Sequence, residues 1–342
     1  MAKKSESSRV STDIRYDKDG KQVSYLRVPN SRDNSGWGTL LMPIAVIKNG
    51  KGPTVLFTGG NHGDEYEGPV ALLKLIRALE AKAIKGRVIV IPGLNFPALM
   101  AGTRLSPIDG RNMNRAFPGE RAGTITQVIA HYVQTQILPM VDAAYDLHSG
   151  GYSMFMTPSV MIHYLPNKKQ MAATVEAMKA FRAPVGLVIE ELDTEGMLDT
   201  AVENMGKVFV GAELGGGAVL TPETIAITEA GIRNVLIHFG MAKGKPETAP
   251  WRGRRESLVM ETPDIGCFSM AMDDGLYEPF LELRDTVAEG QKLGQIHYPQ
   301  APERTPLVVR AGTSGVLYCR RAPGRIEKGD TLAVLAKPSK TW

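Results

Sequence analysis

The sequence predicts an α/β protein with a mostly parallel mixed sheet flanked by helices, followed by a C-terminal all-β domain. Two observations lead to this prediction. Strand-like runs alternate with helical runs along the first two thirds of the chain, an order typical of parallel sheets covered on both faces. A stretch rich in Pro, Gly and Arg at 244–255 then ends the helical periodicity, and short strand-like runs with glycine turns follow.

Apolar spacing predicts the individual elements. Strands are expected at 23–28, 40–46, 54–58, 87–92, 143–147, 186–190 and 208–213, and helices at 68–83, 125–138, 168–181 and 222–240. A length of 342 residues suffices for two domains. We expect a β hairpin extension at 1–50 that packs on an α/β domain at 51–245, and a β domain at 256–342.

Composition excludes several classes of partner. The 40 basic and 36 acidic residues leave a net charge of +4 without dense basic blocks, so no nucleic acid is expected. The N-terminus is polar, and the uncharged stretches at 122–141 and 149–167 contain Gln, His, Gly and Pro, so neither a secretion signal nor a membrane span is expected. A cytoplasmic protein follows, and a homo-oligomer is left open. Cys267 and Cys319 form no CxxC pair, so any metal depends on histidine and carboxylate ligands.

Two motifs at predicted strand ends carry candidate metal ligands. His62 and Glu65 in GGNHGDE are three residues apart, so an imidazole and a carboxylate can reach one cation. His148 in DLHSGG ends another strand, at the edge where α/β sheets bind ligands. Two histidines and one glutamate leave a position open, as in catalytic zinc sites. Asp146 can orient a ligand. The alternative interpretation of the His62 and Glu65 motif is a solvated loop, and that of His148 is a histidine of the core.

Two further motifs carry candidate catalytic and substrate-binding residues. The loop at 103–119 holds Arg104, Arg111 and Arg115, and guanidinium groups near a metal suit carboxylate recognition and oxyanion stabilisation. A solvated basic loop is the alternative. Glu213 follows an apolar strand and precedes three glycines, where a carboxylate can act as general base and then as general acid.

In that order, HGDE, NMNRAF, DLHSG and AELGG resemble the succinylglutamate desuccinylase/aspartoacylase family of the zinc carboxypeptidase clan. The resemblance spans about 50–240 and implies a zinc-carboxypeptidase-like fold with one Zn²⁺ per chain. It implies His62, Glu65 and His148 as zinc ligands and Glu213 as the catalytic carboxylate. The trailing β domain is similar to that of the family. Its glycine turns also resemble barrel-sandwich carrier domains, but no carrier lysine occupies a hairpin tip, so packing, lining of the site or oligomer contact is expected.

The resemblance also implies roles for the polar loop. Asn114 and Arg115 match the pair that grips the substrate α-carboxylate, and Arg104 matches the arginine that polarises the scissile carbonyl, with Arg111 as its competitor. If the substrate carries a second amine, an acidic side chain should meet it. The candidates are Glu67, Glu190, Glu191, Asp193 and Glu195.

The expected function is zinc-dependent hydrolysis of the linear amide of a small N-acyl amino acid. Zinc lowers the pKa of water toward ~7, Glu213 takes its proton, and the same carboxyl later protonates the departing amine. GGNHGDEYEGP and AELGGG look most like the branch of the family that deacetylates N-acetyl-2,4-diaminobutyrate in ectoine breakdown. A deacylase for another N-acyl amino acid, a metallocarboxypeptidase and a metal-binding scaffold protein are the alternatives.

Overall fold

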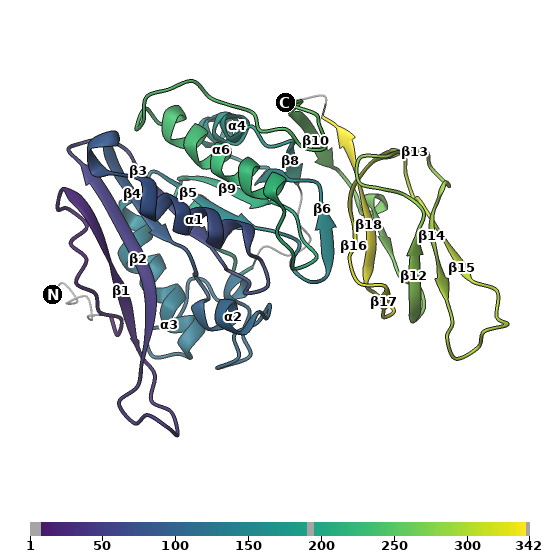
Figure 1. Ribbon diagram of the computed structural model, residues 1–342, viewed down its shortest axis with the longest axis horizontal. Helices are drawn as coiled ribbons and strands as arrows, with labels where there is room; N and C mark the ends of the chain where they lie inside the picture. The colour runs from purple at the N-terminus through teal and green to yellow at the C-terminus, as the bar shows by residue number, and fades with distance from the viewer. Residues whose placement is uncertain (1–7, 190–194, 340–342) are drawn as a thin grey trace.

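The computed structural model describes residues 8–189 and 195–339. Figure 1 shows an α/β lobe, with helices against a twisted sheet, and a β region without α-helices beside it. The long mixed sheet runs in the order β1-β2-β4-β3-β5-β9-β7-β8-β10-β18-β16-β13, and a separate antiparallel sheet runs β15-β14-β12-β17. The predicted fold class is therefore confirmed.

The α/β lobe supplies the first nine strands. They are β1 (Gly20–Pro29), β2 (Thr39–Asn49), β3 (Thr54–Gly59), β4 (Gly86–Ile91), β5 (Ala143–His148), β6 (Met154–Met156), β7 (Ser159–His163), β8 (Val185–Ile189) and β9 (Val208–Glu213). β3 pairs in parallel with β4 and β5, and β5 with β9, so these four neighbouring strands end at one edge. β1 and β2 form the expected edge hairpin, which is antiparallel.

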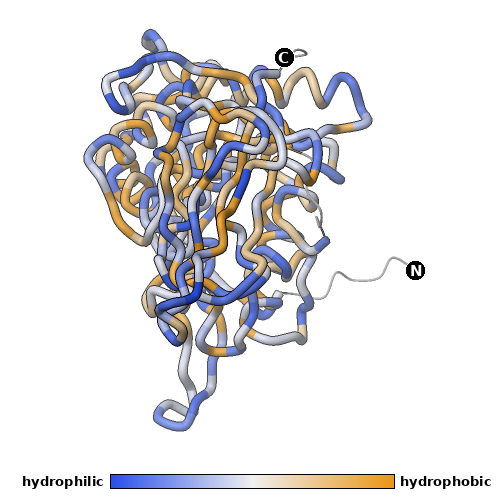
Figure 2. The backbone as a smooth tube through the Cα atoms, turned by 90° about the vertical axis from the view of Figure 1, so that its right-hand side faces the viewer, coloured by the Kyte–Doolittle hydropathy of each residue, from blue (hydrophilic) through white to orange (hydrophobic). Residues whose placement is uncertain are grey.

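In the described part of this lobe, six α-helices cover the two faces of the sheet. They are α1 (Glu67–Ala78), α2 (Phe96–Ala101), α3 (Ile125–Tyr132), α4 (Lys168–Phe181), α5 (Leu198–Glu203) and α6 (Pro222–His238). Successive strand side chains point to opposite faces. Val55 and Phe57 therefore pack with α1, α4 and α6, whereas Leu56 packs with α3 and α5. Figure 2 shows hydrophobic residues along the inner strands and hydrophilic residues in outlying loops.

The C-terminal region contributes the remaining strands. They are β10 (Leu258–Thr262), β11 (Phe268–Met270), β12 (Gly275–Pro279), β13 (Thr286–Val287), β14 (Lys292–His297), β15 (Leu307–Arg310), β16 (Gly315–Arg321), β17 (Arg325–Ile326) and β18 (Thr331–Pro338). β10 pairs in parallel with β8 and antiparallel with β18, and β6 pairs with β16. Backbone hydrogen bonds thus join the α/β lobe to the C-terminal region. The domain limits expected from the sequence, at 1–50, 51–245 and 256–342, stay predictions.

The predicted bounds of individual helices and strands agree with the structure to different degrees. α4 and β9 begin and end as expected, whereas the helix expected at 125–138 is α-helical only to Tyr132 and continues in tighter and wider turns. β7 and α5 were not predicted. The six residues of α5 make fewer than two helical turns, too few for a 3.6-residue period to be recognised, and β7 lies in a stretch with Gly, Pro and hydroxyl residues that are typical of loops. Among the described residues no helix combines the length and apolarity needed to cross a bilayer. The cytoplasmic location stays a prediction.

Candidate active site

The candidate metal ligands and Glu213 come from three strands that are neighbours in the sheet. His62 and Glu65 lie on the loop after β3, His148 is the last residue of β5, and Glu213 is the last residue of β9. His148 and Glu213 are directly paired in the parallel register of β5 and β9. Parallel strands end at the same edge, so residues up to 151 positions apart in sequence meet there.

Two glycines set the path of the loop that carries His62 and Glu65. A Cβ at Gly63 would lie 1.9 Å from the carbonyl carbon of Ala98 in α2, so the loop passes against that helix. A Cβ at Gly68 would lie 2.3 Å from the carbonyl oxygen of Leu147, so the start of α1 abuts the end of β5. These close approaches require glycine and bring Glu65 beside His148.

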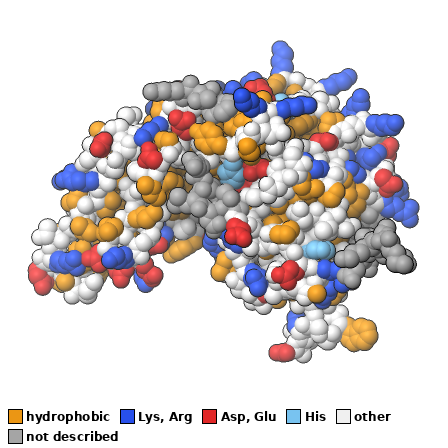
Figure 3. All heavy atoms as spheres, turned by 180° about the vertical axis from the view of Figure 1, so that it is seen from behind, with side chains coloured by type: hydrophobic (Ala, Val, Ile, Leu, Met, Phe, Trp, Pro, Cys, Tyr) orange, Lys and Arg blue, Asp and Glu red, His pale blue; other side chains and the backbone are white. Residues whose placement is uncertain are grey.

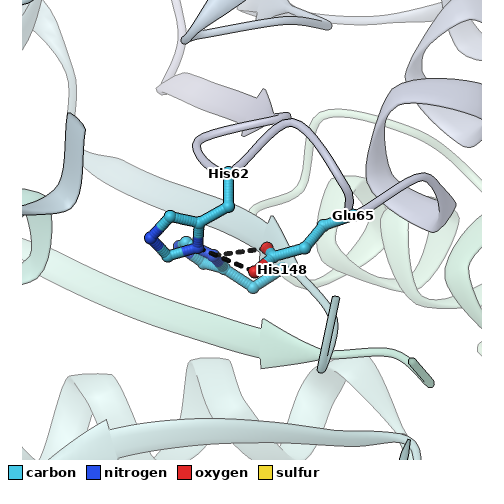
Figure 4. Close-up of side chains that lie close together, drawn as sticks. All are labelled: His62, Glu65 and His148. Carbon is cyan, nitrogen blue, oxygen red and sulfur yellow. Dashed lines mark hydrogen bonds and ion pairs between the residues drawn. The ribbon is translucent and has the colours of Figure 1, made fainter. Parts of the chain in front are cut away.

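Glu65 lies between the two imidazoles (Figure 4). His62 Nδ1 is 2.7 Å from Glu65 Oε1, and His148 Nδ1 is 2.8 Å from Glu65 Oε2. One potential ligand atom from each residue lies within 4.8 Å of the others. The His62 and Glu65 side chains are only 4% and 2% exposed, and that of His148 is 11% exposed. The cluster is therefore largely shielded from water.

The far nitrogen of each ring is also held. His148 Nε2 lies 2.8 Å from Asp146 Oδ2, and Asn61 donates to the same oxygen at 2.7 Å. Thr58 Oγ1 donates to Asp146 Oδ1 at 2.7 Å. His62 Nε2 lies 3.1 Å from Asn112 Oδ1. Such outer partners fix the ring orientation of metal-binding histidines.

Burial and charge oppose each other at these groups, and charge prevails. Burial raises the pKa of Glu65, but the neighbouring His62 and His148 outweigh it and hold that pKa well below its usual range. Burial also raises the pKa of Asp146, but the charge of His148 and hydrogen bonds outweigh it, so this pKa is lowered. Burial lowers the pKa of His148, but Asp146 and Glu65 outweigh it, so this pKa is raised. The carboxylates are thus kept ionised in a buried place, which favours a positive charge between them.

The donor set matches the metal that the sequence predicts. Two imidazoles and one carboxylate, each ring fixed through its second nitrogen, make the ligand set of a catalytic zinc site with a position left for water or substrate. The residues present therefore fit Zn²⁺, with both Nδ1 atoms facing Glu65.

The structure separates the two competing arginines. Arg104 Nη1 lies 3.3 Å from His62 Nδ1 and 3.5 Å from Glu65 Oε1. Arg111 is exposed, and it lines neither of the two cavities that meet at His62. Asn114 and Arg115 line a cavity with Arg104, and Arg115 Nη1 donates to the Asn114 carbonyl oxygen at 2.7 Å.

Two cavities meet at His62, Arg104 and Glu213. One, of about 150 Å³, contains the polar side chains of Asn114, Arg115 and Asp199 and the apolar side chains of Met161, Ile162, Met197 and Phe209. The other, of about 360 Å³, is lined in addition by Ser149, Ser153, Met154, Met156, Arg321 and Thr331. Arg321 and Thr331 belong to the C-terminal region, so this region lines the site, one of the roles expected for it.

Glu213 lies close to that region. Burial, together with the charge of Glu213, raises the pKa of both Tyr318 and Cys319 on β16. Tyr318 is held by a 2.7 Å hydrogen bond between its hydroxyl and that of Ser159 on β7. Figure 3 shows acidic, basic and apolar side chains interspersed over the back of the molecule.

Several residues that contact the site groups were not predicted from the sequence. Thr58 and Asn61 donate to Asp146, and Asn112 contacts His62; Asn61 and Asn112 stood within recognised motifs without being singled out, and Thr58 did not. Glu67 is buried outside both cavities, where burial raises its pKa to about 7, and Glu195 is exposed outside both. Glu190, Glu191 and Asp193 lie outside the described residues. Asp199 lines the smaller cavity instead. Its place in a helical first turn gave no functional signal.

The catalytic-domain family of succinylglutamate desuccinylase and aspartoacylase matches residues 51–239. The chain belongs to this family. Membership confirms the prediction of a hydrolase that acts on the amide of N-acyl amino acids.

Similar proteins extend the match over nearly the whole chain. N-alpha-acetyl-L-2,4-diaminobutyric acid deacetylase of Halomonas elongata is 42% identical over 330 residues, covering 96% of this chain and 95% of that protein. The product-bound structure of the ectoine utilization protein EutE (DoeB) from Ruegeria pomeroyi has a TM-score of 0.93 and 44% identity over 97% of this chain and 99% of that one. A succinylglutamate desuccinylase structure from Silicibacter sp. TM1040 has a TM-score of 0.93 and 45% identity, with the same coverage.

Proposed function

We propose that this chain is a zinc-dependent deacetylase that converts N-acetyl-2,4-diaminobutyrate into acetate and 2,4-diaminobutyrate in ectoine breakdown. One observation supports it most strongly. Ligand atoms of two imidazoles and a carboxylate lie within 4.8 Å of one another, at the edge of the sheet where β9 ends in Glu213. The names of the relatives from Halomonas elongata and Ruegeria pomeroyi, at 42% and 44% identity, support the substrate.

His62, Glu65 and His148 would hold the metal. Bound Zn²⁺ supplies a Lewis acid that polarises the amide carbonyl and makes water more acidic. Asp146 and Asn112 keep the two imidazole rings oriented through their Nε2 atoms.

Glu213 moves the proton. Its carboxylate accepts a proton from the attacking water, which forms the new C–O bond, and delivers it to the amine as the C–N bond breaks. Arg104, 3.3 Å from His62 Nδ1, donates hydrogen bonds to the carbonyl oxygen as negative charge develops there. Asn114 and Arg115 bind the α-carboxylate of the amino acid from the same cavity wall.

The smaller cavity, of about 150 Å³, offers charged and amide groups beside the candidate metal ligands, among them Asn114 and Arg115. Both an amino-acid deacylase and a metallocarboxypeptidase would bind a free α-carboxylate there. The substrate panel below separates the two.

The deciding experiment replaces Glu213 with Gln. We expect hydrolysis of N-acetyl-2,4-diaminobutyrate to fall ~10²–10⁴-fold, because the proton carrier is lost, with unchanged zinc content by elemental analysis. Glu303→Gln, at an exposed position outside both cavities of the site, should keep full activity and serves as the matched control. Unchanged hydrolysis by Glu213→Gln would remove this mechanism.

A substrate panel separates the alternatives. Wild type should hydrolyse N-acetyl-2,4-diaminobutyrate faster than N-succinylglutamate, N-acetylaspartate or a short peptide, and a chelator should abolish the reaction. A faster rate with the peptide would favour a carboxypeptidase. No turnover of any substrate by the zinc-loaded protein would favour a scaffold.

A further inference from the structure

We propose that the larger cavity of the site binds the acyl group of the substrate, and that the ion pair between Arg321 and Asp330 makes this cavity select an uncharged acetyl group over a succinyl group. This inference rests on the proposed deacetylase function and deepens it. Arg321 lines the cavity, and its Nη2 atom lies 2.9 Å from Asp330 Oδ2. The two side chains are 14% and 28% exposed, so the pair is partly shielded from water.

The candidate metal ligands stand between the two cavities. His148 lines the smaller cavity and Glu65 the larger one, while His62, Arg104 and Glu213 line both. The carbonyl that is attacked has to lie next to the metal, with the amine on one side of it and the acyl chain on the other. Because the proposed ligands of the α-carboxylate belong to the smaller cavity, the acyl chain extends into the larger one.

The lining of the larger cavity leaves one cation to face the acyl chain. Among the described residues that line it, the charged side chains outside the metal ligands are Arg104, Glu213 and Arg321. Arg104 is assigned to the carbonyl oxygen and Glu213 to the proton, so Arg321 remains. The cavity, at about 360 Å³, is roomier than the other one, and its size alone therefore does not favour an acetyl group.

Backbone contacts hold both members of the ion pair in place. Arg321 is paired with Met154 in the antiparallel register of β16 and β6. The backbone N–H of Glu327 donates to Asp330 Oδ2 at 2.9 Å, and the backbone N–H of Ala271 donates to the Asp330 carbonyl oxygen at 2.8 Å. A carboxylate anchored in this way stays beside Arg321 without a further loss of conformational freedom when a ligand enters.

Charge then distinguishes the two acyl groups, because a succinyl group carries a terminal carboxylate and an acetyl group does not. A guanidinium without an acidic neighbour would attract that carboxylate, and Arg321 Nε is buried with no acceptor among the described residues. Asp330 cancels the positive charge of Arg321 and repels a second carboxylate at close range. The ion pair thus opposes a charged acyl group and leaves an uncharged one unopposed.

The contact between Arg321 and Asp330 could instead serve only the stability of the C-terminal region. That role predicts a lower Tm on its loss and equal effects on every acyl group. Asp330→Asn separates the two explanations, because asparagine keeps an oxygen acceptor for the Glu327 N–H while the negative charge is lost.

The test compares N-acetyl-2,4-diaminobutyrate with N-succinyl-2,4-diaminobutyrate, which share the amino acid and differ in the acyl group. For Asp330→Asn we expect the ratio of kcat/KM on the succinyl compound to kcat/KM on the acetyl compound to rise about 10-fold, mainly through a lower KM for the succinyl compound. A double variant with Asp330→Asn and Arg321→Gln should lose this gain, because the cation that would bind the succinyl carboxylate is gone.

Asp273→Asn is the matched control. Asp273 Oδ2 also lies 2.9 Å from an arginine, Arg304 Nη2, in the C-terminal region, but neither residue lines the two cavities. This variant should leave the ratio of the two substrates unaltered.

An unchanged ratio in Asp330→Asn, or a gain that the double variant retains, would overturn the proposal, as would a wild type that prefers the succinyl compound. Failure of the proposed function looks different, because wild type would then hydrolyse neither compound. Calorimetry with the zinc-loaded protein decides in that case. Succinate binding that is about 10-fold tighter in Asp330→Asn than in wild type, without the same change for acetate, would support the charge selection. Equal succinate binding, or an equal change for both ligands, would overturn it.

Discussion

His148 Nδ1 lies 2.8 Å from Glu65 Oε2 at the end of β5, and His297 Nε2 lies 2.8 Å from Glu278 Oε2 on the C-terminal sheet. The first pair is 11% and 2% exposed, and the second is 43% and 51% exposed. The nitrogen–oxygen distance is thus the same in both pairs, but the first pair is buried and the second is exposed. Water screens the second pair, whereas little water reaches the first.

The two pairs also differ in what surrounds them. Glu65 faces a second imidazole, His62, and the ring of His148 is held from behind by Asp146. His297 and Glu278 come from paired antiparallel strands, and their neighbour Gln295 is an amide. A metal site requires several ligand atoms that converge in a protected place, and a single close histidine–glutamate contact does not provide this.

Replacing His148 with Ala should have the largest effect. The loss of one ligand from a buried set should release the metal and reduce kcat/KM by about 10³-fold or more, because several kcal/mol of charge stabilisation disappear. Zinc content and hydrolysis of N-acetyl-2,4-diaminobutyrate are the measurements. His297→Ala is the matched control and should retain both zinc content and hydrolysis. Comparable losses in the two variants would contradict the difference proposed between the buried and the exposed pair.

Arg104 and Arg111 extend the comparison to charges near and far from the buried cluster. Arg104→Ala should lower kcat ~10²–10³-fold, since it removes a donor aimed at the developing oxyanion. Arg111→Ala should change kcat by a small factor only, because Arg111 is exposed and outside both cavities. Steady-state kinetics of both variants decide the matter, and a larger loss in Arg111→Ala would reverse the assignment.

Asp146→Asn should produce an intermediate effect. An amide is a weaker partner for His148 Nε2 than a carboxylate, so zinc affinity should drop about 10- to 100-fold. Competition with a metal-binding dye measures this affinity. Asp109→Asn alters a carboxylate that accepts hydrogen bonds from the backbone N–H and hydroxyl of Thr126 in the first turn of α3, and it should leave zinc affinity unchanged. Equal affinity in Asp146→Asn and wild type would show that the residue does not support the ligand.

Glu278→Gln should have the smallest effect. Hydrogen bonds from His297 and Gln295 lower the pKa of Glu278. A lowered folded-state pKa means that any stabilisation is present above the unfolded glutamate value of about 4.3 and is lost as pH falls through the folded value. A slight decrease in Tm is expected at neutral pH, with convergence toward wild type in acid. Circular dichroism melts over a pH series test this, and a decrease that grows in acid would contradict it.

Residue order along the chain was enough to predict the α/β class, α4 and β9, since α4 is a long amphipathic run and β9 is a continuous apolar run that ends before a glycine turn. His62 and Glu65 could be paired in advance because they are only three positions apart. Local spacing could not show that His148 and Glu213 are neighbours, since this depends on the order of β3, β5 and β9 in the sheet. The choice between Arg104 and Arg111, and the burial of Asp199 in the cavity, also depended on packing between distant segments. Such contacts are decided by how strands and helices stack, which no short stretch of chain encodes.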